Sequence, residues 1–472
     1  MDSELILRGV SLAEETACAL GDPRRSARLQ RAAAALAQDP TRSFPKLFPT
    51  EAEREGFYRL IDSPFVSFRK VIAAHHEATV RRAEELGEVL AVHDTTEFVF
   101  PAHDDHVREH LCPLSKRRQG FYGHVTLAVS TDGLRAPLGV LGFFGFVHRQ
   151  QVSAETARFW TEQFGDYEKE SKRWVMAFAD AEERIRGRAS VIHVCDREAD
   201  TNEVLECLHS RNWRYVIRAF QGRVTTDGVP VGEVARGGSL SVEREITLSH
   251  REDGDRPPKS RKAFPRRRAR TAKVVIRAQG ASLATGRGEI ETNVVEVIEV
   301  NAPEGEEPIQ WTLLTNETVN DEQSLLRVVD IYRSRWLIEE YFKAIKTGCA
   351  YEERQLDSSA SLLVALGITL VVAWQLLVLR HLSRHPEAQK RPASTIMAPI
   401  MLALLKAATR KSITWPEEPT IFDAMCGVAR LGGHIKSNGL PGWQVLGRGL
   451  EKLLAIKDAV DVALAEGLVI NP

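Results

Sequence analysis

Five short apolar runs, separated by helical patterns and turns, constrain the fold of this chain more than any other feature. Runs of roughly four to eight apolar residues bounded by turn residues are typical of buried strands. A long helical pattern at 167–186 precedes the fourth run, and a shorter one after Asp200 separates the fourth from the fifth. Strands followed by alternating helices and strands predict a mixed sheet of the α/β class. The runs are 89–92, 125–129, 138–147, 191–195 and 215–217.

The sequence between about 221 and 310 differs in pattern, because apolar and polar residues alternate and turn residues are frequent. An apolar run at 311–314 follows it. We expect a β-rich insertion into the α/β domain. Within it, 256–273 carries nine Lys and Arg residues, three prolines and no acid. Such a segment predicts a flexible basic loop, which is either solvated or in contact with DNA.

The first helices begin at strong local signals. Asp22 stands before Pro23 as a capping residue before a proline at the first helical position, and the helix should run to about Ala37. A capping box at Thr50 starts a second helix, and a third is expected at about 67–86. The first 65 or so residues therefore form a small helical module.

Arginines line one face of the first of these helices. Their spacing of four and then three residues places them together on the helix surface, where phosphates can reach them. Two interpretations stay open from periodicity alone, a DNA-binding module and an ordinary helical bundle with solvated arginines. The arginines on this face are Arg24, Arg28 and Arg31.

Composition decides less. The 63 basic and 64 acidic residues nearly cancel, so a DNA surface must come from local clustering. Six cysteines without a CxxC pair and an N-terminus without a secretory signal favour the cytoplasm. The apolar stretch at 362–379 is near the lower limit for a membrane span, but a buried helix fits better. The chain after about Ser361 is expected to be helical, and 321–347 to be one long helix ended by Gly348.

Three carboxylates are placed as two-metal cleavage of a phosphodiester requires, on separate elements. Asp94 ends the first apolar run and Asp196 ends the fourth, where open α/β sheets present ligands. Glu339 lies on the long helix. Each strand-end Asp has a structural alternative, because Asp commonly ends strands or caps the next helix. The neighbouring acids Glu97, Glu198, Asp200 and Glu340 could act instead.

One face of that long helix carries a phenol, two cations and a carboxylate, within an arc of about 60°. The four residues are Tyr332, Arg335, Glu339 and Lys346. A solvated salt-bridge face is the alternative, but flanking apolar residues indicate a partly buried helix. A second titratable cluster, 103–106 with His110, could ligate a transition metal.

The spacing Tyr332-x2-Arg335-x3-Glu339-x6-Lys346 resembles the YREK signature of insertion-sequence-4-type transposases. Four further segments match in the same order along nearly the whole chain. They are ALGDPRRSARL at 19–29, HDTT at 93–96, CDREAD at 195–200 and WLIEEYFKAIKTG at 336–348. The sequence is therefore similar to bacterial DDE transposases of this type.

The resemblance implies an RNase H-like catalytic core. It implies a helical DNA-binding module at 1–66, a catalytic domain at 67–360 with a β-rich insertion at about 221–310, and a helical dimerisation domain at 361–472. Asp94, Asp196 and Glu339 would be the DDE triad, binding two Mg²⁺ ions with Mn²⁺ as a substitute. No nucleotide cofactor and no membrane partner are expected.

Side chains that contact double-stranded DNA also follow from the resemblance. Tyr332, Arg335 and Lys346 would hold the terminal phosphates of the transposon end, and Trp311 would stack on a flipped base. Softer assignments to DNA contact are Arg218, Lys343, Arg24, Arg25 and Arg28. The sequence departs from relatives at Phe220 and Asn202, where they carry Lys and His.

The resemblance further implies a cut-and-paste reaction through a DNA hairpin, in a synaptic homodimer to which a C-terminal helix at about 453–465 contributes. The protein would be cytoplasmic and associated with the nucleoid when bound to transposon ends and target DNA. Two alternatives stay open. One is an RNase H-like, metal-dependent DNA nuclease, and the other is a catalytically silent regulator that binds DNA.

Overall fold

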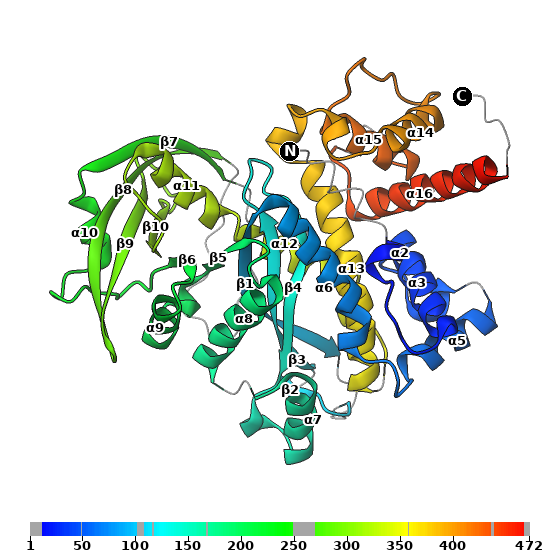
Figure 1. The fold of residues 1–472 in the computed structure, drawn as a ribbon, viewed down its shortest axis with the longest axis horizontal. Helices are drawn as coiled ribbons and strands as arrows, with labels where there is room; N and C mark the ends of the chain where they lie inside the picture. Colours follow the sequence, from blue (N-terminus) through cyan, green and yellow to red (C-terminus); the bar gives the residue numbers. More distant parts are fainter. Residues whose placement is uncertain are drawn as a thin grey trace. The chain divides into compact units, whose positions relative to one another are not determined.

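A computed structural model describes residues 12–48, 50–101, 108–115, 118–166, 169–248, 270–356, 358–435 and 439–466. The chain divides into two compact units, and each is described by itself. Unit 1 comprises Met1–Ser190 and Trp336–Pro472, and unit 2 comprises Val191–Arg335. Together they have the mixed α/β character predicted from the apolar runs, with helices and a large set of paired strands (Figure 1).

The N-terminal helices of unit 1 begin where their capping residues predict. The side chain of Asp22 accepts a hydrogen bond from the backbone of Arg24, with Pro23 in the first turn, and Thr50 forms a capping box with Glu53. Both boundaries are confirmed, as is the third helix after Ser67. The elements are α2 (Leu12–Glu15), α3 (Pro23–Gln38), α4 (Phe44–Leu47), α5 (Glu51–Ile61) and α6 (Phe68–Leu86).

The strands of unit 1 form an antiparallel set centred on β3. Strand β3 pairs with β1 along its whole length, and β4 and β2 follow one another along its other edge. The first predicted run ended too early, because β1 continues to Pro101 through pairing with the first half of β3. The strands are β1 (Glu88–Pro101), β2 (Cys112–Ser115), β3 (Arg118–Ser130) and β4 (Pro137–Phe146).

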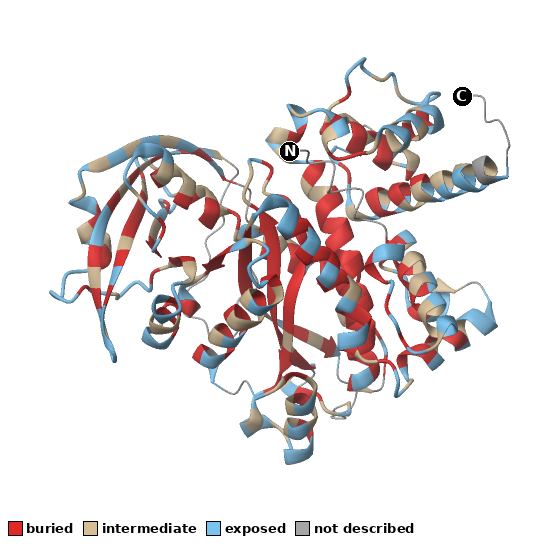
Figure 2. Cartoon of the chain, in the orientation of Figure 1, coloured by how far each residue is buried: buried red, intermediate tan, exposed pale blue. Residues whose placement is uncertain are grey.

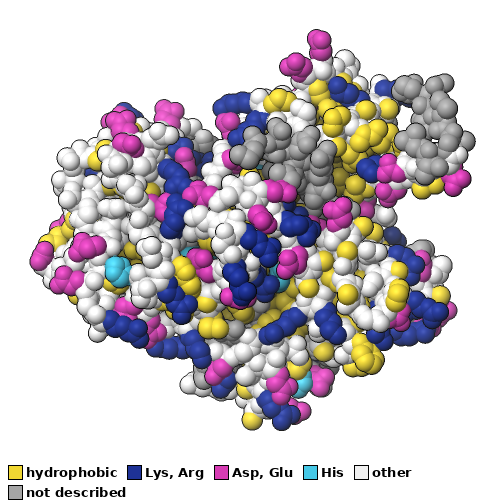
Figure 3. Space-filling view, in the orientation of Figure 1, with side chains coloured by type: hydrophobic (Ala, Val, Ile, Leu, Met, Phe, Trp, Pro, Cys, Tyr) yellow, Lys and Arg dark blue, Asp and Glu magenta, His cyan; other side chains and the backbone are white. Residues whose placement is uncertain are grey.

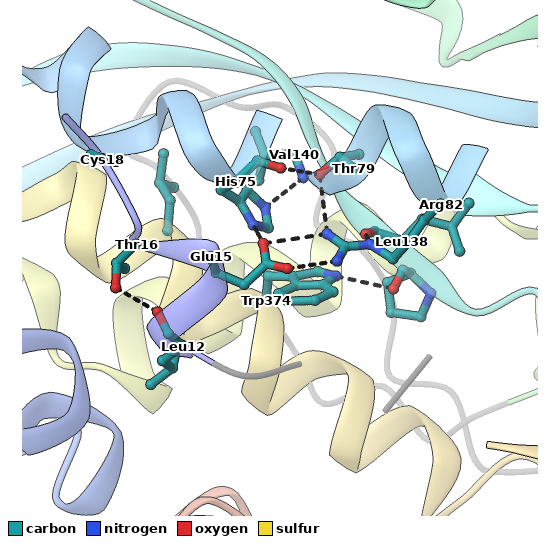
Figure 4. Close-up of polar contacts among 12 residues, drawn as sticks. Leu12, Glu15, Thr16, Cys18, His75, Thr79, Arg82, Leu138, Val140 and Trp374 are labelled. Carbon is teal, nitrogen blue, oxygen red and sulfur yellow. Dashed lines mark hydrogen bonds and ion pairs between the residues drawn. The ribbon is translucent and has the colours of Figure 1, made fainter. Parts of the chain in front are cut away.

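Helix α6 covers the outer edge of β4, where backbone groups would otherwise lack partners. The Val140 N–H donates to Nε2 of His75 at 2.9 Å, and Nε of Arg82 donates to the Leu138 carbonyl at 2.6 Å. Glu15 of α2 binds both of these side chains and is itself fully buried (Figure 4). A buried ionic network, named here the Glu15 network, therefore joins α2, α6 and the sheet edge.

Protonation in the Glu15 network follows from its geometry. Because Nε2 of His75 accepts the Val140 N–H, the proton of the neutral ring is on Nδ1 and faces Glu15. Burial lowers the pKa of His75 below its ordinary value despite the nearby carboxylate. Burial alone would raise the pKa of Glu15, but His75 and Arg82 lower it. Glu15 is thus an anion held between a cation and a neutral imidazole.

The two faces of the unit 1 sheet are covered by different elements. On one face, the rings of Trp174 and Phe178 pack on His124 and His93. Trp174 and Phe178 belong to α8 (Glu170–Ile185). The two elements before α8 are the short η1 turn (Arg149–Gln151) and then α7 (Ala154–Phe164). On the other face, Phe98 contacts Tyr351 of the η4 turn (Tyr351–Glu353). Because side chains alternate along a strand, Asp94 shares the face of Phe98.

The long apolar stretch forms α13 (Ser359–Leu382), a core helix rather than a surface element. It is long and apolar enough to cross a membrane, yet its most apolar window is wholly buried inside the protein (Figure 2). The remaining elements of this part are α14 (Pro399–Thr409), α15 (Ile421–Leu431), α16 (Trp443–Ala465) and two short turns, η5 (Pro386–Gln389) and η6 (Ala393–Thr395). The helical C-terminal part is confirmed.

Unit 2 is built on one parallel and several antiparallel strand pairs. Strands β5 and β6 are parallel, whereas β6, β10, β9, β8 and β7 pair antiparallel in that order. The strands are β5 (Ser190–Cys195), β6 (Arg214–Arg218), β7 (Leu240–Leu248), β8 (Arg270–Thr285), β9 (Gly288–Glu299) and β10 (Gln310–Thr315). The helices are η2 (Arg197–Ala199), α9 (Asn202–Ser210), α10 (Val231–Arg236) and α11 (Glu322–Arg333).

Two predictions for the second half of the chain need correction. The basic loop ends earlier than Lys273, because Arg270–Lys273 already pair with β7, and the rest of the loop lies outside the described residues. The long helix at 321–347 is broken. Helix α11 ends at Arg333, α12 (Trp336–Lys343) follows, and the last turn, η3 (Ala344–Gly348), is a π-helix.

The break has a local cause. The Ser334 hydroxyl donates to the Asp330 carbonyl at 3.1 Å, and the Arg335 N–H bonds to the Tyr332 carbonyl only three residues back. Such bonds compete with the regular α-helical ladder and tighten its end. Tyr332 and Arg335 therefore close unit 2, while Glu339 and Lys346 belong to unit 1. The predicted arc on one continuous helix was wrong.

Candidate active site

Asp94 lies in the middle of β1 rather than at its end. It pairs in register with Val125 of β3, and its side chain is 9% exposed. Its Oδ1 accepts the backbone N–H of Thr95 at 2.7 Å. A carboxylate that is nearly buried in a sheet and held by a backbone donor has a fixed position, as a metal ligand requires.

Glu339 stands in the first turn of α12, which packs on β1 within unit 1. The neighbouring acid Glu340 is already engaged, because its oxygens lie 2.9 Å from Nζ of Lys343 and 3.5 Å from Arg380 of α13. Glu340 therefore has a structural task in joining α12 to α13. Lys343 also lies 5.1 Å from the centre of the exposed Trp336 ring.

Lys346 lies on the π-helical turn, beside β1. Its Nζ is 3.6 Å from Oε1 of Glu352, and 5.9 Å from the centre of the Phe98 ring. The same Glu352 oxygen accepts the N–H of Val99 at 2.9 Å. Glu352 was not singled out from the sequence, since only the fold brings it to β1. Both side chains are partly exposed, so this lysine can exchange its carboxylate partner for another anion.

Asp196 directly follows β5 and caps the η2 turn by accepting the N–H of Glu198 at 2.9 Å. Asp200 follows four residues later and is fully buried, with Arg223 at 2.7 Å and the Phe220 N–H at 2.6 Å from its oxygens. The capping alternative proposed for strand-end acids thus holds for Asp196 as well. Asp200, in contrast, is fully engaged in holding a turn.

Four functional candidates gather beside Asp196 within unit 2. The charges of Arg335, Arg218 and Asp196 lie close enough to the Tyr332 hydroxyl to shift its pKa. Burial raises the pKa of Tyr332, the two arginines pull it back, and Asp196 adds to the rise. Trp311 packs edge-on against Tyr332, with 5.7 Å between the ring centres. A phenol donor, two cations and an aromatic ring next to a carboxylate suit the end of a DNA strand.

The N-terminal arginines differ in their freedom. Arg24 is exposed on α3. Arg28 is half-buried, because its side chain lies against Gly56 of α5. Arg25 donates to the Leu20 carbonyl and covers the Phe65 ring at 4.5 Å. Across the face drawn in Figure 3, basic side chains are interspersed with acidic ones, as the near-zero net charge predicts.

No group of three or more His, Cys, Asp or Glu side chains forms a metal site among the described residues. The proposed cluster at 103–106 lies outside them. The donor chemistry of Asp94, Asp196 and Glu339 nevertheless fits a hard divalent cation, because all three offer carboxylate oxygens. Two of them, Asp94 and Glu339, stand on elements that pack together within unit 1.

Comparison with protein families gives two matches, in the order in which the regions occur along the chain. Residues 11–66 match the family described as transposase DNA-binding, and residues 170–374 match the family described as transposase DDE domain. The two matches support a transposase that binds DNA and acts on it as an enzyme.

The matched ranges map onto the elements described above. The DNA-binding domain spans α2 to α5, and the DDE domain runs from the start of α8 into α13. Asp196 and Glu339 fall inside the matched DDE range, whereas Asp94 on β1 lies before it. The buried Glu15 thus belongs to the DNA-binding domain, although it binds two side chains of α6.

Proposed function

We propose that this transposase excises a mobile DNA element and joins it to new DNA through a hairpin intermediate. The observation that carries the proposal is the group of Tyr332, Arg335, Arg218 and Trp311 beside Asp196, in a chain that bears both transposase domains. A simple nuclease needs no such group, because it releases the strand that it cuts.

The catalytic domain is RNase H-like in this proposal, with the β-rich strands β7 to β9 as its insertion. Its bounds are 67–360, between a DNA-binding module at 1–66 and a dimerisation domain at 361–472. Asp94, Asp196 and Glu339 form the triad. They would hold two Mg²⁺ ions, or Mn²⁺ in their place, which activate the attacking oxygen and stabilise the leaving oxygen.

The other side chains bind and orient the DNA. Arg335 and Lys346 neutralise terminal phosphates, and the Tyr332 hydroxyl donates to a phosphate oxygen. Trp311 receives a base that leaves the stack, which supports the sharp bend of a hairpin. Arg218, Lys343 and the N-terminal arginines add contacts to the backbone of the same DNA.

The reaction then has four steps on each element end. Hydrolysis frees a 3′-OH, which attacks the opposite strand to form the hairpin. A second hydrolysis reopens it, and the 3′ end attacks target DNA. Two chains acting together in a synaptic dimer would hold both ends, with α16 and its exposed Val462 at the contact. We place this reaction in the cytoplasm, on the nucleoid.

The test uses purified full-length protein, Mg²⁺ and a supercoiled plasmid that carries the DNA flanking the gene. The wild-type protein is expected to release hairpin-ended DNA. Glu339→Gln removes one triad charge with little change of shape and is expected to abolish the hairpin. The matched control is Glu340→Gln on the same helix, where loss of a partly exposed ion pair leaves cleavage largely intact.

Other outcomes point to other functions. Nicks without hairpins in the wild-type reaction identify a metal-dependent nuclease, and DNA binding without any cleavage identifies a silent regulator. Equal activity of Glu339→Gln and the wild-type protein removes Glu339 from the triad. Loss of cleavage in Glu340→Gln but not in Glu339→Gln exchanges the roles of the two acids.

A further inference from the structure

Phe220 is an exposed aromatic side chain immediately after β6. It is 57% exposed, although a phenyl ring in water is unfavourable and has no polar group to compensate. Isolated exposed apolar residues are ordinary on protein surfaces. This one differs because its backbone is held firmly and its neighbours are those of the candidate active site.

The turn that carries Phe220 is fixed by buried charge. The Phe220 N–H donates to Asp200 at 2.6 Å, and the Phe220 carbonyl accepts the N–H of Arg223. Arg223 binds the same carboxylate at 2.7 Å and also donates to Asn202 at 2.7 Å. Asn202 and Phe220 are therefore both tied to the Asp200–Arg223 pair. The backbone of such a turn has little conformational freedom left to lose on binding.

Phe220 also directly follows the strand ladder that carries Trp311. Arg218 pairs in register with Leu313, and the Ala219 N–H continues the ladder by donating to the Thr312 carbonyl at 2.8 Å. The next positions on the two chains are Phe220 and Trp311. Arg218, whose charge acts on Tyr332, precedes Phe220 by two residues and ends β6.

We propose that Phe220 is a second base-stacking side chain, which holds an unpaired nucleobase of the DNA end next to the one at Trp311. This inference deepens the proposed function and rests on it. A phenyl ring offers a flat apolar face that fits a base and has no group that would bind a phosphate.

The probe that tests this is a short duplex from the DNA flanking the gene, with a single-stranded overhang of thymines. A second probe has abasic sites in the same overhang. Binding is measured by fluorescence anisotropy with Ca²⁺ in place of Mg²⁺. Phe220→Ala is expected to weaken binding of the thymine probe by about tenfold, because stacking on each base contributes roughly that much. Binding of the abasic probe should not change.

Two control variants separate stacking from loss of structure. Phe220→Trp keeps a flat ring and is expected to bind both probes as the wild-type protein does. Val224→Ala removes an exposed aliphatic side chain from the same loop and should affect neither probe. Equal weakening of both probes by Phe220→Ala, or no weakening of either, would overturn the proposal.

DNA cleavage tests the proposed function separately from DNA binding. The same thymine probe in Mg²⁺ reports cleavage, which Glu339→Gln is expected to abolish. If the wild-type protein never cleaves DNA but binds the thymine probe in a Phe220-dependent way, the stacking proposal is supported and the proposed function is contradicted. If the Phe220→Ala variant cleaves DNA normally and its anisotropy with both probes is unchanged, the proposed function is supported and the stacking proposal is contradicted.

Discussion

Asp196 and Asp200 stand four residues apart after the same strand, yet the two regions that they control differ in kind. Asp196 is partly exposed, caps a short turn and lies near Tyr332, on whose pKa Arg335 and Arg218 also act. Asp200 is buried and fully bonded to Arg223 and to a backbone N–H. The difference teaches that the partners of a carboxylate, more than its place after a strand, separate a catalytic candidate from a structural acid.

The same contrast recurs in unit 1. Glu15 is enclosed by His75 and Arg82, and Glu340 is paired with Lys343 and Arg380. Removing a structural acid leaves a cation without its anion, so the free energy of unfolding should fall. Removing a catalytic acid should lower the reaction rate and leave folding nearly unchanged. The variants below test this separation.

Asp196→Asn gives the largest expected effect, which is on the rate of DNA cleavage and not on stability. Asparagine caps a helix as well as aspartate does, so the melting temperature should stay close to that of the wild-type protein. The rate of DNA end cleavage in Mg²⁺ should fall by at least about 10³-fold, or roughly 4 kcal/mol in the barrier. A stability loss with retained cleavage would place Asp196 among the structural acids.

Glu15→Gln gives the largest expected effect on folding. Arg82 would be left buried without its anion, which costs about 3–5 kcal/mol in unfolding free energy, measured by urea denaturation. The control is Glu55→Gln, because Glu55 and Arg59 form an exposed pair worth about 0.5 kcal/mol or less. The pKa of Glu15 is lowered, so its contribution is present above the ordinary value of 4.5 and is lost as the pH falls further. Equal effects of the two variants would contradict the role of the Glu15 network.

Asp200→Asn should have a smaller effect on folding, about 2–3 kcal/mol, because Arg223 is 13% exposed and keeps some hydration. The amide oxygen can still accept the Phe220 N–H. Urea denaturation measures the loss, and the cleavage rate of the remaining folded protein should fall by less than tenfold. A rate loss as large as that of Asp196→Asn would erase the distinction between the two acids.

Glu451→Gln gives the smallest effect, and one that depends on pH. Burial raises the pKa of Glu451 to about 7, although Gln375 of α13 lowers it and Asp458 adds to the rise. The folded state therefore retains a proton between 4.5 and about 7 that the unfolded state has lost, and stability falls as the pH rises through this window. The unfolding free energy of the wild-type protein, measured by urea denaturation, should be lower at about pH 8 than at about pH 5 by on the order of 1–3 kcal/mol. The variant should lose most of this difference.

Much of the fold could be predicted because its signals are local. A cap at Asp22 or Thr50 acts on groups within three residues, so the sequence contains all that decides the helix start. The second half of β1 could not be predicted in this way. It becomes a strand by pairing with residues of β3, and its own sequence lacks a continuous apolar run. The break at Ser334 was also missed, because the helical spacing of the sequence continues through it.

The candidate site shows the same division. Residue types and spacing sufficed to select Asp94, Asp196 and Glu339, which stay predictions until cleavage is measured. They could not assign Asp200 or Glu340 a structural task. Asp200 meets Arg223 from 23 residues away, and Glu340 meets Arg380 on a different helix. Such partners depend on the path of the chain, and only the folded structure brings them together.

The Glu15 network has a consequence for any shortened form of this chain. A shorter product whose translation starts after α2 would lack Glu15, the anion between His75 and Arg82. Arg82 would then be buried beside β4 as a cation without its anion, which costs free energy of folding. Such a product would fold less stably than the full chain, so the first helix of the DNA-binding domain also stabilises the helix that follows that domain.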